Sequence, residues 1–379
     1  MFEIHEKPSS GTNIKVIGVG GAGGNAVDHM IREGVQGVDF ICANTDAQAL
    51  SRCLAPTKVQ LGKTGLGAGS KPEAGRAAAQ ESRDAIAAAM EGAHMCFITA
   101  GMGGGTGTGA APIVAELAKE MGVLTVAVVT KPFDFENRIR VAESGVEELS
   151  KQVDSLIVVL NDKLLEVFGD DAGFEDCFRS ADNVLTSAVG GIAEIINVPG
   201  LVNVDFQDVR TAMAEMGRAM MGSAEASGLD RARIAAEQAA VSPLLEGTEL
   251  SGARCVLINI TASRSLKMSE VRDAVRTVQA FAASEAFVKY GTVFDESMGD
   301  RIRVTVVATG LGSMRAAAVR KPEVQVVRTG TDNVGVEVDY GNLELPAVIR
   351  RTPRTTVEAM SANGMSILDI PAFLRKQAD

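Results

Sequence analysis

The seven residues from Gly103 to Gly109 read Gly-Gly-Gly-Thr-Gly-Thr-Gly and constrain the fold more than any other part of the chain. They lie between an apolar run, Met95 to Ala100, and a segment with helical spacing of apolar residues that opens at Ala110. Glycine is costly to order, so a run of this kind needs a reason. Bare backbone N–H groups can point together at an anion, and the N-terminus of the following helix favours negative charge. The placement predicts a phosphate-binding loop rather than a flexible linker.

Composition and charge exclude several classes of protein. A formal net charge of −11 argues against a nucleic-acid-binding protein, which would carry a basic surface. The 3 histidines (His5, His29 and His94) are scattered, so a histidine metal site or a catalytic triad is not expected. The 5 cysteines share no metal-like spacing and are predicted to be reduced, buried thiols. The polar start of the chain and the lack of any apolar run near the roughly 18 residues of a membrane helix predict a cytoplasmic protein.

Strand-like and helix-like segments alternate from Ile14 to Leu160, which predicts an α/β fold with a doubly wound, parallel sheet. The expected strands are 14–19, 38–43, 95–100, 123–129 and 155–160, and the expected helices are 25–32, 75–90, 110–121 and 141–152. In such a sheet the ligand loops gather at the carboxyl ends of the strands.

A long central helix is predicted next, because apolar residues from Phe174 to Ile195 are spaced three and four apart until Pro199-Gly200. Helices at 209–217, 224–240 and 268–283 and strands at 255–260, 286–294 and 301–309 then indicate a smaller α+β domain. Residues 317–366 mix Thr, Arg, Asp, Gly and Pro and are predicted to be a disordered linker. Apolar residues return in a short segment at 367–379.

A second glycine loop, Gly18-Val19-Gly20-Gly21-Ala22-Gly23, fits the dinucleotide fingerprint G-x-G-x-x-G, with Asp46 after the next expected strand. Taken alone, this pattern indicates an NAD-dependent oxidoreductase. Such an enzyme has no use for the richer loop at Gly103 or for a third glycine loop at Gly65 to Gly69. Three loops together indicate a cradle for a triphosphate, and neither the loop at Gly18 nor the loop at Gly103 has the Gly-Lys-Ser/Thr ending of the common P-loop.

With Ala110-Ala111-Pro112 after it, the loop at Gly103 resembles the signature of the tubulin superfamily, and its neighbours resemble the FtsZ family of bacterial cell-division GTPases. The resemblance runs from about residue 14 to 310 and resumes at 369–379. The other matching segments are 44–50, 65–69, 130–133, 161–165 and 203–206. Small departures are Ala22, Asn137 and Gln207, which stand where the family usually has Gly, Gly and Ala.

The resemblance implies a filament protein that polymerises head to tail on binding GTP and hydrolyses it to GDP, with Mg²⁺ as a second cofactor. It divides the chain into a flexible N-terminus (1–11), a GTP-binding domain (12–173), a central connecting helix (174–200), an α+β GTPase-activating domain (201–316), the linker (317–366) and a partner-binding peptide (367–379). The competing classes are the oxidoreductase and a nucleotide-binding scaffold that polymerises without turnover.

A guanine site is predicted on the long helix. Guanine presents two adjacent N–H donors that a carboxylate can accept together, and a flat face that an aromatic ring can cover. Phe178 and Asp182 are four residues apart and share a helix face, with Asn25 as a further polar group. Phe178 could equally be a core residue and Asp182 a solvated charge, and either Asp182 or its neighbour Asn183 could reach the base.

Glu136 and Arg140 are also four apart, which by itself suggests only a helix salt pair, whereas the resemblance assigns them to ribose and nucleotide. The full set of predicted GTP-binding residues is Gly20, Gly21, Ala22, Gly23, Gly24, Asn25, Ala68, Gly69, Gly103, Gly104, Gly105, Thr106, Gly107, Thr108, Glu136, Arg140, Phe178, Asp182 and Asn183.

The phosphate loops contain no obvious general base. Asp205 and Asp208 follow the long helix and, as residues, resemble a capping box for the helix expected from Val209. The resemblance instead implies that Asn203, Asp205 and Asp208 enter the next subunit's nucleotide pocket and orient the attacking water. One surface then carries the cradle and the opposite surface the catalytic residues, an arrangement that propagates into filaments.

The C-terminal peptide combines apolar anchors with a basic end beyond a polar tether. It could dock back on its own domain, but a long tether is not needed for that, so a short helix that folds on binding a partner is expected. The predicted contacts are Asp369, Ile370, Pro371, Phe373, Leu374, Arg375 and Lys376. The resemblance implies membrane-tethering adaptors and division regulators as partners, with no direct membrane insertion and no nucleic acid.

Overall fold

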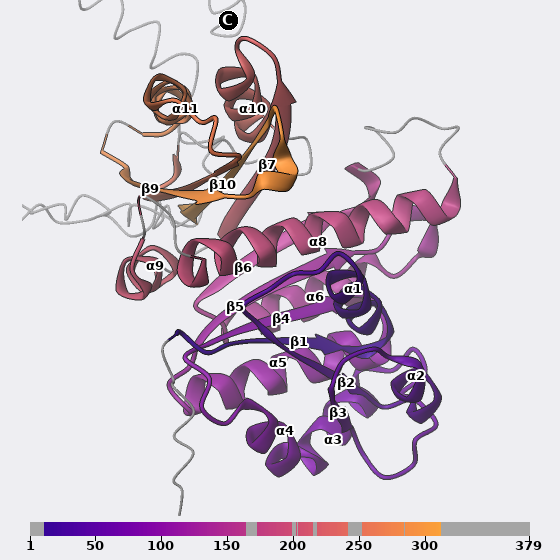
Figure 1. The fold of residues 1–379 in the computed structure, drawn as a ribbon. Coiled ribbons are helices and arrows are strands. Elements are labelled where there is room, and N and C mark those ends of the chain that lie inside the picture. The colour runs from indigo at the N-terminus through magenta and orange to yellow at the C-terminus, as the bar shows by residue number, and fades with distance from the viewer. Residues whose placement is uncertain are drawn as a thin grey trace, which may run out of the picture. The chain divides into compact units, whose positions relative to one another are not determined.

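The computed structural model describes residues 11–163, 173–198, 202, 204–214, 218–241, 252–283 and 285–311. These residues belong to one compact unit, Met1–Ala316. The predicted linker and C-terminal peptide lie outside the described residues, as do residues 1–10. In the described part of the chain the strands form a 10-stranded sheet with the order β3-β2-β1-β4-β5-β6-β7-β10-β8-β9 (Figure 1).

The first half of the sheet is parallel and doubly wound, which confirms the predicted fold class. Its strands are β1 (Ile14–Val19), β2 (Asp39–Asn44), β3 (Thr57–Gln60), β4 (Met95–Gly101), β5 (Leu124–Lys131) and β6 (Ser155–Leu160). Its helices are α1 (Gly20–Arg32), α2 (Ala47–Arg52), α3 (Pro72–Glu81), α4 (Arg83–Met90), α5 (Gly105–Glu120) and α6 (Ile139–Ser150), with a short 3-10 helix η1 (Asp134–Glu136) after β5.

The second half continues the same sheet, because β6 and β7 pair in parallel through Leu156 with Arg218 and Ile157 with Ala219. β10 is antiparallel to β7 and β8, and β9 is parallel to β8. The elements are α8 (Phe174–Asn197), α9 (Phe206–Met213), β7 (Arg218–Ser227), α10 (Arg231–Ala240), β8 (Cys255–Ala262), α11 (Met268–Phe281), β9 (Phe287–Phe294), η3 (Glu296–Met298) and β10 (Arg301–Leu311).

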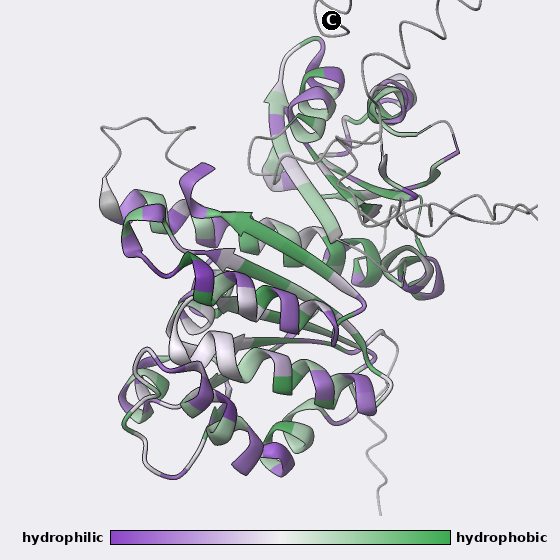
Figure 2. Ribbon diagram, turned by 180° about the vertical axis from the view of Figure 1, so that it is seen from behind, coloured by the Kyte–Doolittle hydropathy of each residue, from purple (hydrophilic) through white to green (hydrophobic). Residues whose placement is uncertain are grey.

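Helix α8 is the long helix predicted from the sequence, and it lies between the two halves of the sheet (Figure 1). Its buried residues Leu185, Val189 and Ile192 join one core cluster with Val16 of β1 and Phe97 of β4. The same cluster reaches Leu257 and Val307 of the second half. Apolar strands flanked by helices with polar outer faces are visible in Figure 2. Helix α8 is therefore packed against both halves of the sheet.

The helix expected at 224–240 is partly wrong, because residues 218–227 form strand β7 and only 231–240 are helical. The alanine-rich sequence favours a helix locally. In the fold, alternate residues of β7 face different cores: Ala219 and Met221 join the α8 cluster, and Met220 and Ala224 pack with α10 and α11. Pairing with β10 along nearly its whole length overrides the local preference.

Both glycine loops near the predicted cradle are more helical than expected. Helix α1 begins at Gly20 rather than Asn25, and α5 begins at Gly105 rather than Ala110. The single helix expected at 75–90 is two helices that meet at Ser82, and α2 and β3 were not expected. The five cysteines are free and buried, as predicted. Within the described ranges no helix is both long and apolar enough to cross a membrane.

A buried arginine cluster joins the helices of the second half. Arg231 of α10 is 4% exposed, and its Nε donates to Glu270 Oε1 of α11 at 2.8 Å while a terminal nitrogen donates to the Asp300 carbonyl oxygen at 2.8 Å. The Arg231 hydrogen bond holds the pKa of Glu270 below its usual value, so the pair stabilises the fold at neutral pH and loses this effect as the pH falls.

Replacing Arg231 by methionine should lower the free energy of unfolding by about 3 to 5 kcal/mol, because the Glu270 carboxylate would remain in a largely buried place without its cation. Urea unfolding at neutral pH measures this. Arg233→Met is the matched control, since Arg233 pairs with Asp230 and Glu237 at an exposed place and should change stability by less than about 1 kcal/mol. Equal losses in the two variants would contradict the expectation.

Candidate nucleotide-binding site

A cavity of about 380 Å³ lies where the ends of β1, β4, β5 and β6 meet helix α8. The carboxyl ends of parallel strands share one edge of a sheet, so the segments that follow them gather there. The cavity is lined by residues in or beside each of the three glycine segments and by residues of α8. The lining residues are Val19, Gly21, Ala22, Asn25, Gly69, Ala100, Gly101, Met102, Gly104, Gly105, Thr106, Gly107, Thr130, Pro132, Glu136, Arg138, Asn161, Phe178, Ala181, Asp182 and Leu185.

Two helices begin at this cavity without a side-chain cap. Helix α1 starts after Val19 and α5 starts after Gly104, and neither of these residues makes a capping hydrogen bond with its side chain. The first N–H groups of a helix have no partner inside the helix and carry partial positive charge. Two such ends that converge on one cavity make a binding place for an anion with several phosphates.

Several glycines are required by close packing rather than by a ligand. A Cβ atom at Gly105 would lie 2.3 Å from the Gly69 carbonyl oxygen, and one at Gly107 would lie 2.4 Å from that of Gly101. Gly20 has φ +77°, and a Cβ there would lie 3.0 Å from the Gly107 nitrogen, so the first two glycine segments touch. By contrast, the space in front of Gly104 is open. Glycine at these positions lets the backbone segments around the cavity pack closely against one another.

The remaining predicted glycine-loop residues shape the walls without lining the cavity. Gly23 and Gly24 are buried in α1, and a Cβ at Gly23 would lie 2.4 Å from the Thr99 carbonyl oxygen. Thr108 is buried, and its hydroxyl accepts from the Gly103 N–H at 2.8 Å. Ala68 precedes Gly69, which does line the cavity.

Helices α8 and α1 form one side of the cavity. Phe178 is 38% exposed, so it is not the core residue that its place on the apolar stripe allowed, and its ring meets that of Phe133 edge-on at 5.5 Å. Asp182 lines the cavity together with Asn25. Burial raises the pKa of the Asp182 carboxyl to about 6, while His29 acts in the opposite direction.

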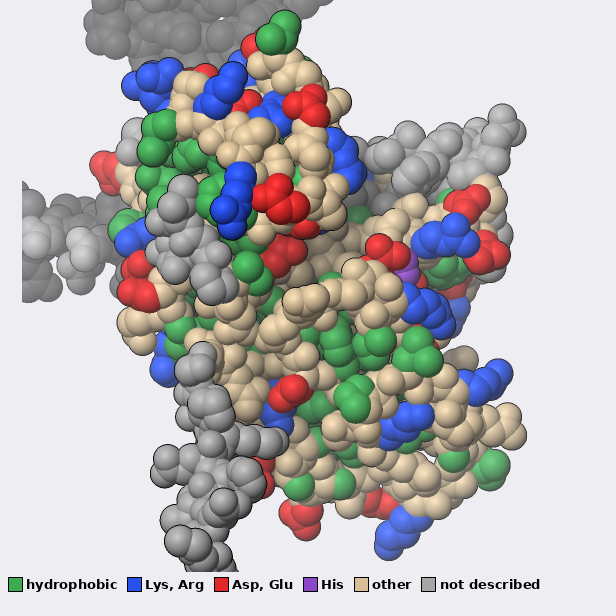
Figure 3. Space-filling model, viewed as in Figure 1, with side chains coloured by type: hydrophobic (Ala, Val, Ile, Leu, Met, Phe, Trp, Pro, Cys, Tyr) green, Lys and Arg blue, Asp and Glu red, His purple; other side chains and the backbone are tan. Residues whose placement is uncertain are grey.

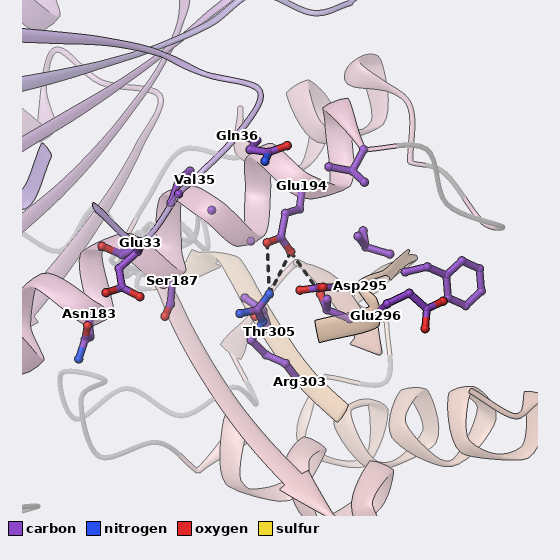
Figure 4. Close-up of a pocket in the computed structure, with 18 residues that line it drawn as sticks. Glu33, Val35, Gln36, Asn183, Ser187, Glu194, Asp295, Glu296, Arg303 and Thr305 are labelled. Carbon is purple, nitrogen blue, oxygen red and sulfur yellow. Dashed lines mark hydrogen bonds and ion pairs between the residues drawn. The ribbon is translucent and has the colours of Figure 1, made fainter. Parts of the chain in front are cut away.

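Asn183 faces elsewhere. Its Oδ1 lies 2.6 Å from His29 Nε2, and it lines a second cavity of about 540 Å³ between α8 and the second half of the sheet. In that cavity Glu194 accepts from Arg303 at 3.2 Å and from the Thr261 hydroxyl at 3.2 Å (Figure 4). Between the two neighbouring candidates for guanine, the geometry favours Asp182.

Glu136 lines the cavity, but Arg140 does not, and the helix pair expected between them is absent from the described contacts. Glu136 pairs instead with Arg138, and its Oε1 accepts from the Phe133 N–H at 3.0 Å. Asn137 separates η1 from α6 with φ +55°, so residues 136 and 140 do not share one helix. This left-handed conformation is one that asparagine and glycine adopt more readily than other residues.

Asn161 is a site residue that the sequence interpretation missed. It is 5% exposed and lines the cavity, and its side-chain Oδ1 has no hydrogen-bond partner in the described part of the chain. Buried polar atoms are seldom left without a partner, so this oxygen is available to a bound ligand. Asn161 directly follows β6, just as glycine segments follow β1 and β4. This position at the carboxyl end of a strand was the signal that could have identified it from the sequence.

Asp205 and Asp208 lie at the other end of α8 from the cavity. Helix α8 has 24 residues, which corresponds to a length of about 36 Å. Asp205 is the N-cap of α9 and accepts from the Asp208 N–H at 2.7 Å, so the capping interpretation holds for it. The Asp208 carboxylate instead accepts from Lys289 Nζ at 3.0 Å. Asn203 lies outside the described residues.

Comparison with known proteins agrees with this architecture. Residues 13–169 match the Tubulin/FtsZ family, GTPase domain, and residues 217–312 match the FtsZ family, C-terminal domain. The cell division protein FtsZ of Coxiella burnetii is 52% identical over 99% of both chains, and that of Pseudomonas aeruginosa is 51% identical over 100% of both. An empty FtsZ dimer of M. jannaschii has a TM-score of 0.75 at 42% identity and covers 79% of this chain and 88% of its own.

The parallel sheet, the two uncapped helix starts and the matched domain define a GTPase of the tubulin-like class. Because both of its domain models match and relatives about half identical align over the full length, the chain belongs to the FtsZ family. The resemblance found in the sequence and the predicted GTPase activity are thereby confirmed, and the oxidoreductase interpretation is set aside. Asp46, the residue that suggested NAD, caps α2 by accepting from the Gln48 N–H at 2.8 Å.

Proposed function

We propose that this GTPase assembles into head-to-tail filaments at the bacterial division site and completes its hydrolytic site only at the junction between two subunits. One observation carries the proposal: the cavity lies beside the first half of helix α8, and the Asp205–Asp208 segment at the start of α9 follows its opposite end. Asp182 at the cavity and Asn197 at the end of α8 are 15 residues apart, about 22 Å along the helix, and a subunit cannot bring its own Asp208 to its own nucleotide across this distance. A neighbour stacked in the same orientation can.

In this arrangement one surface meets a different surface of the next copy, so the contact repeats instead of closing. Self-association has a precedent in the relatives, since one M. jannaschii FtsZ structure is a dimer. The triphosphate would lie on the α1 and α5 N-termini, and the base would lie against Phe178 with Asp182 accepting its two N–H donors. Asp205 and Asp208 of the neighbour would orient the water that attacks the γ-phosphate.

Mg²⁺ would accompany the triphosphate. Among the described residues no group of three or more His, Cys, Asp or Glu side chains is placed to hold a metal ion. Mg²⁺ is commonly held by phosphates, waters and one or two protein oxygens. The bound ion would neutralise phosphate charge, and the cavity's own oxygen ligands, such as Thr106 and Asn161 Oδ1, are the candidates to contact it or its waters.

A concentration series tests the proposal. Phosphate release per subunit should rise steeply above a threshold protein concentration, because only assembled subunits own a complete site. A rate per subunit that stays constant across the series would overturn it, and a polymer without phosphate release would support the scaffold alternative.

Asp182 should determine the preference for GTP over ATP. Asp182→Ala should reduce that preference by about 1 to 3 kcal/mol, roughly 5- to 150-fold, because the guanine donors lose their paired acceptor. Competition binding below the assembly threshold measures it, with Asn183→Ala as the neighbouring control. Unchanged selectivity in Asp182→Ala, or a loss in Asn183→Ala instead, would remove the assignment.

The same carboxyl should make GTP binding pH-dependent. With the Asp182 pKa near 6, the carboxylate accepts both guanine donors at pH 7 and becomes protonated below pH 6. GTP affinity should therefore fall as the pH is lowered through this range, by about tenfold at pH 5. Asp182→Asn should bind more weakly and lack this pH dependence. A wild-type profile that is flat between pH 5 and 7 speaks against the assignment.

The C-terminal peptide is proposed to recruit membrane-tethering adaptors. Deleting 369–379 should leave GTP turnover and filament formation nearly intact while abolishing adaptor binding and placement at the division site. Phe373→Ala alone should cost much of the binding, because a short motif depends on few anchors. Co-sedimentation of filaments with adaptors measures it. A truncated protein that still binds adaptors normally, or that cannot hydrolyse GTP, contradicts this role.

A further inference from the structure

The surface that carries Asp208 contains a lysine that the proposed hydrolytic mechanism does not use. Lys289 extends from β9, the last strand of the sheet, and its Nζ lies 3.0 Å from Asp208 Oδ2 on α9. The two side chains are 36% and 32% exposed, so the ion pair is only half open to water. Lys289 also lies over the ring of Phe287, 5.3 Å from its centroid.

Strand β9 contacts the described residues that precede Asp208 at two places. Val202 forms an isolated bridge with Thr292, and the Thr292 N–H donates to the Val202 carbonyl oxygen at 3.1 Å. A Cβ atom at Gly291 would lie 3.4 Å from Val204, so the chain also runs close there. Asp208 and Lys289 make the next contact in this series. The lysine thus fixes the carboxylate at the point where the segment enters helix α9.

The surroundings suit a surface that another subunit covers. Hydrophobic side chains gather over α11 and β9 in Figure 3, and the exposed ones include Met268, Phe281, Phe287 and Tyr290. Exposed apolar side chains grouped in this way are typical of a contact surface. When that surface meets a neighbour's nucleotide, two carboxylates approach a triphosphate, and like charges raise the free energy of docking.

We propose that Lys289 is a positioning residue of the shared hydrolytic site: it holds the Asp208 carboxylate in place and offsets its repulsion from the neighbouring subunit's triphosphate. This inference rests on the proposed function, since it requires Asp208 to act across the junction. It assigns to Lys289 both an effect on assembly and an effect on turnover within the polymer, and no effect on nucleotide binding by a free subunit.

Lys289→Met tests the inference, because it keeps an unbranched apolar stem and removes the charge. The assembly threshold in low salt should rise by about 1.5-fold to fivefold, the range expected for a partly exposed charge pair. Salt screens repulsion, so the difference from wild type should shrink as ionic strength rises. GTP turnover per assembled subunit should fall, whereas GTP affinity below the assembly threshold should stay unchanged. Lys289→Arg keeps the positive charge and should match wild type in both the assembly threshold and the turnover.

Two further variants separate this role from simpler ones. Arg233→Met breaks an exposed ion pair of the same half and changes the net charge equally, so it should leave the threshold and its salt dependence as in wild type. In an Asp208→Asn background the repulsion by Asp208 is removed, and Lys289→Met should then raise the threshold less than it does in the presence of Asp208. A Lys289→Met threshold that equals wild type in low salt, or a rise that salt does not reduce, would overturn the inference.

Failure of the inference can be told from failure of the proposed function. If Asp208→Ala retains normal turnover, hydrolysis does not depend on this surface and both fall together. If Asp208→Ala loses turnover while Lys289→Met behaves as wild type, only the role of Lys289 falls.

Discussion

Asp208→Ala protein is expected to bind GTP and to form filaments, yet to release phosphate on the order of a hundredfold more slowly than wild type. The reason is that the nucleotide cavity stays intact at one end of α8, while the carboxylate that orients water is lost at the other. Sedimentation measures assembly and a phosphate assay measures turnover. Asp205→Ala is less clean, because Asp205 also caps α9.

Mixing the variant with wild-type protein shows whether the site is shared. A subunit that lacks Asp208 should silence its neighbour's nucleotide, so turnover per wild-type subunit should fall as the fraction of variant rises. If activity declines only in proportion to dilution, hydrolysis is completed within one subunit. Mixing with Arg233→Met protein should leave the wild-type rate unchanged.

Gly105→Ser should abolish GTP binding by free subunits, with a loss of affinity on the order of a hundredfold or more. A Cβ atom at Gly105 would lie 2.3 Å from the Gly69 carbonyl oxygen and 3.0 Å from the Lys71 nitrogen, so the wall of the cradle must move. Isothermal titration with GTP measures the loss, and circular dichroism reports whether the fold survives.

Gly190→Ala is the matched control, since Gly190 lies within α8 and the nearest atom to an added Cβ is 3.8 Å away. It should bind GTP as wild type does. A folded Gly105→Ser protein with wild-type affinity would show that the cradle does not need this close approach.

Much of the fold was predictable because most strands of the first half are largely apolar, whereas the short and polar β3 was missed. β1 and β6 match the expected ranges, and α8 follows its apolar spacing to within a few residues of Pro199. The predictions that failed concern elements whose structure depends on residues far away in the sequence. The sequence of β7 predicts a helix because it is rich in alanine, but the segment is a strand because it pairs with β10, some eighty residues later. The early starts of α1 and α5 were hidden by glycine, whose low helix propensity is overridden by packing between backbones.

Site residues were predictable from the sequence where residue type and helical spacing agree. They were less predictable where a turn interrupts the helix. Phe178 and Asp182 reach one cavity because a helix repeats its face every four residues. Glu136 and Arg140 have the same spacing, but Asn137 breaks the helix between them, and Arg138 takes the place at the cavity. Lys289 could not be found from sequence, because its contact with Asp208 joins positions 81 residues apart.

The unbroken helix α8 has a consequence for polarity. Its two ends carry different chemistry, with the nucleotide cavity beside its first half and the Asp205–Asp208 segment of α9 beyond its last residue. A filament built by stacking such subunits in one direction has two unequal tips. One tip exposes an open cavity that can exchange its nucleotide with solution, whereas the other exposes the acidic start of α9. Growth, exchange and shrinkage are then expected to differ between the tips, although every subunit along the filament is the same.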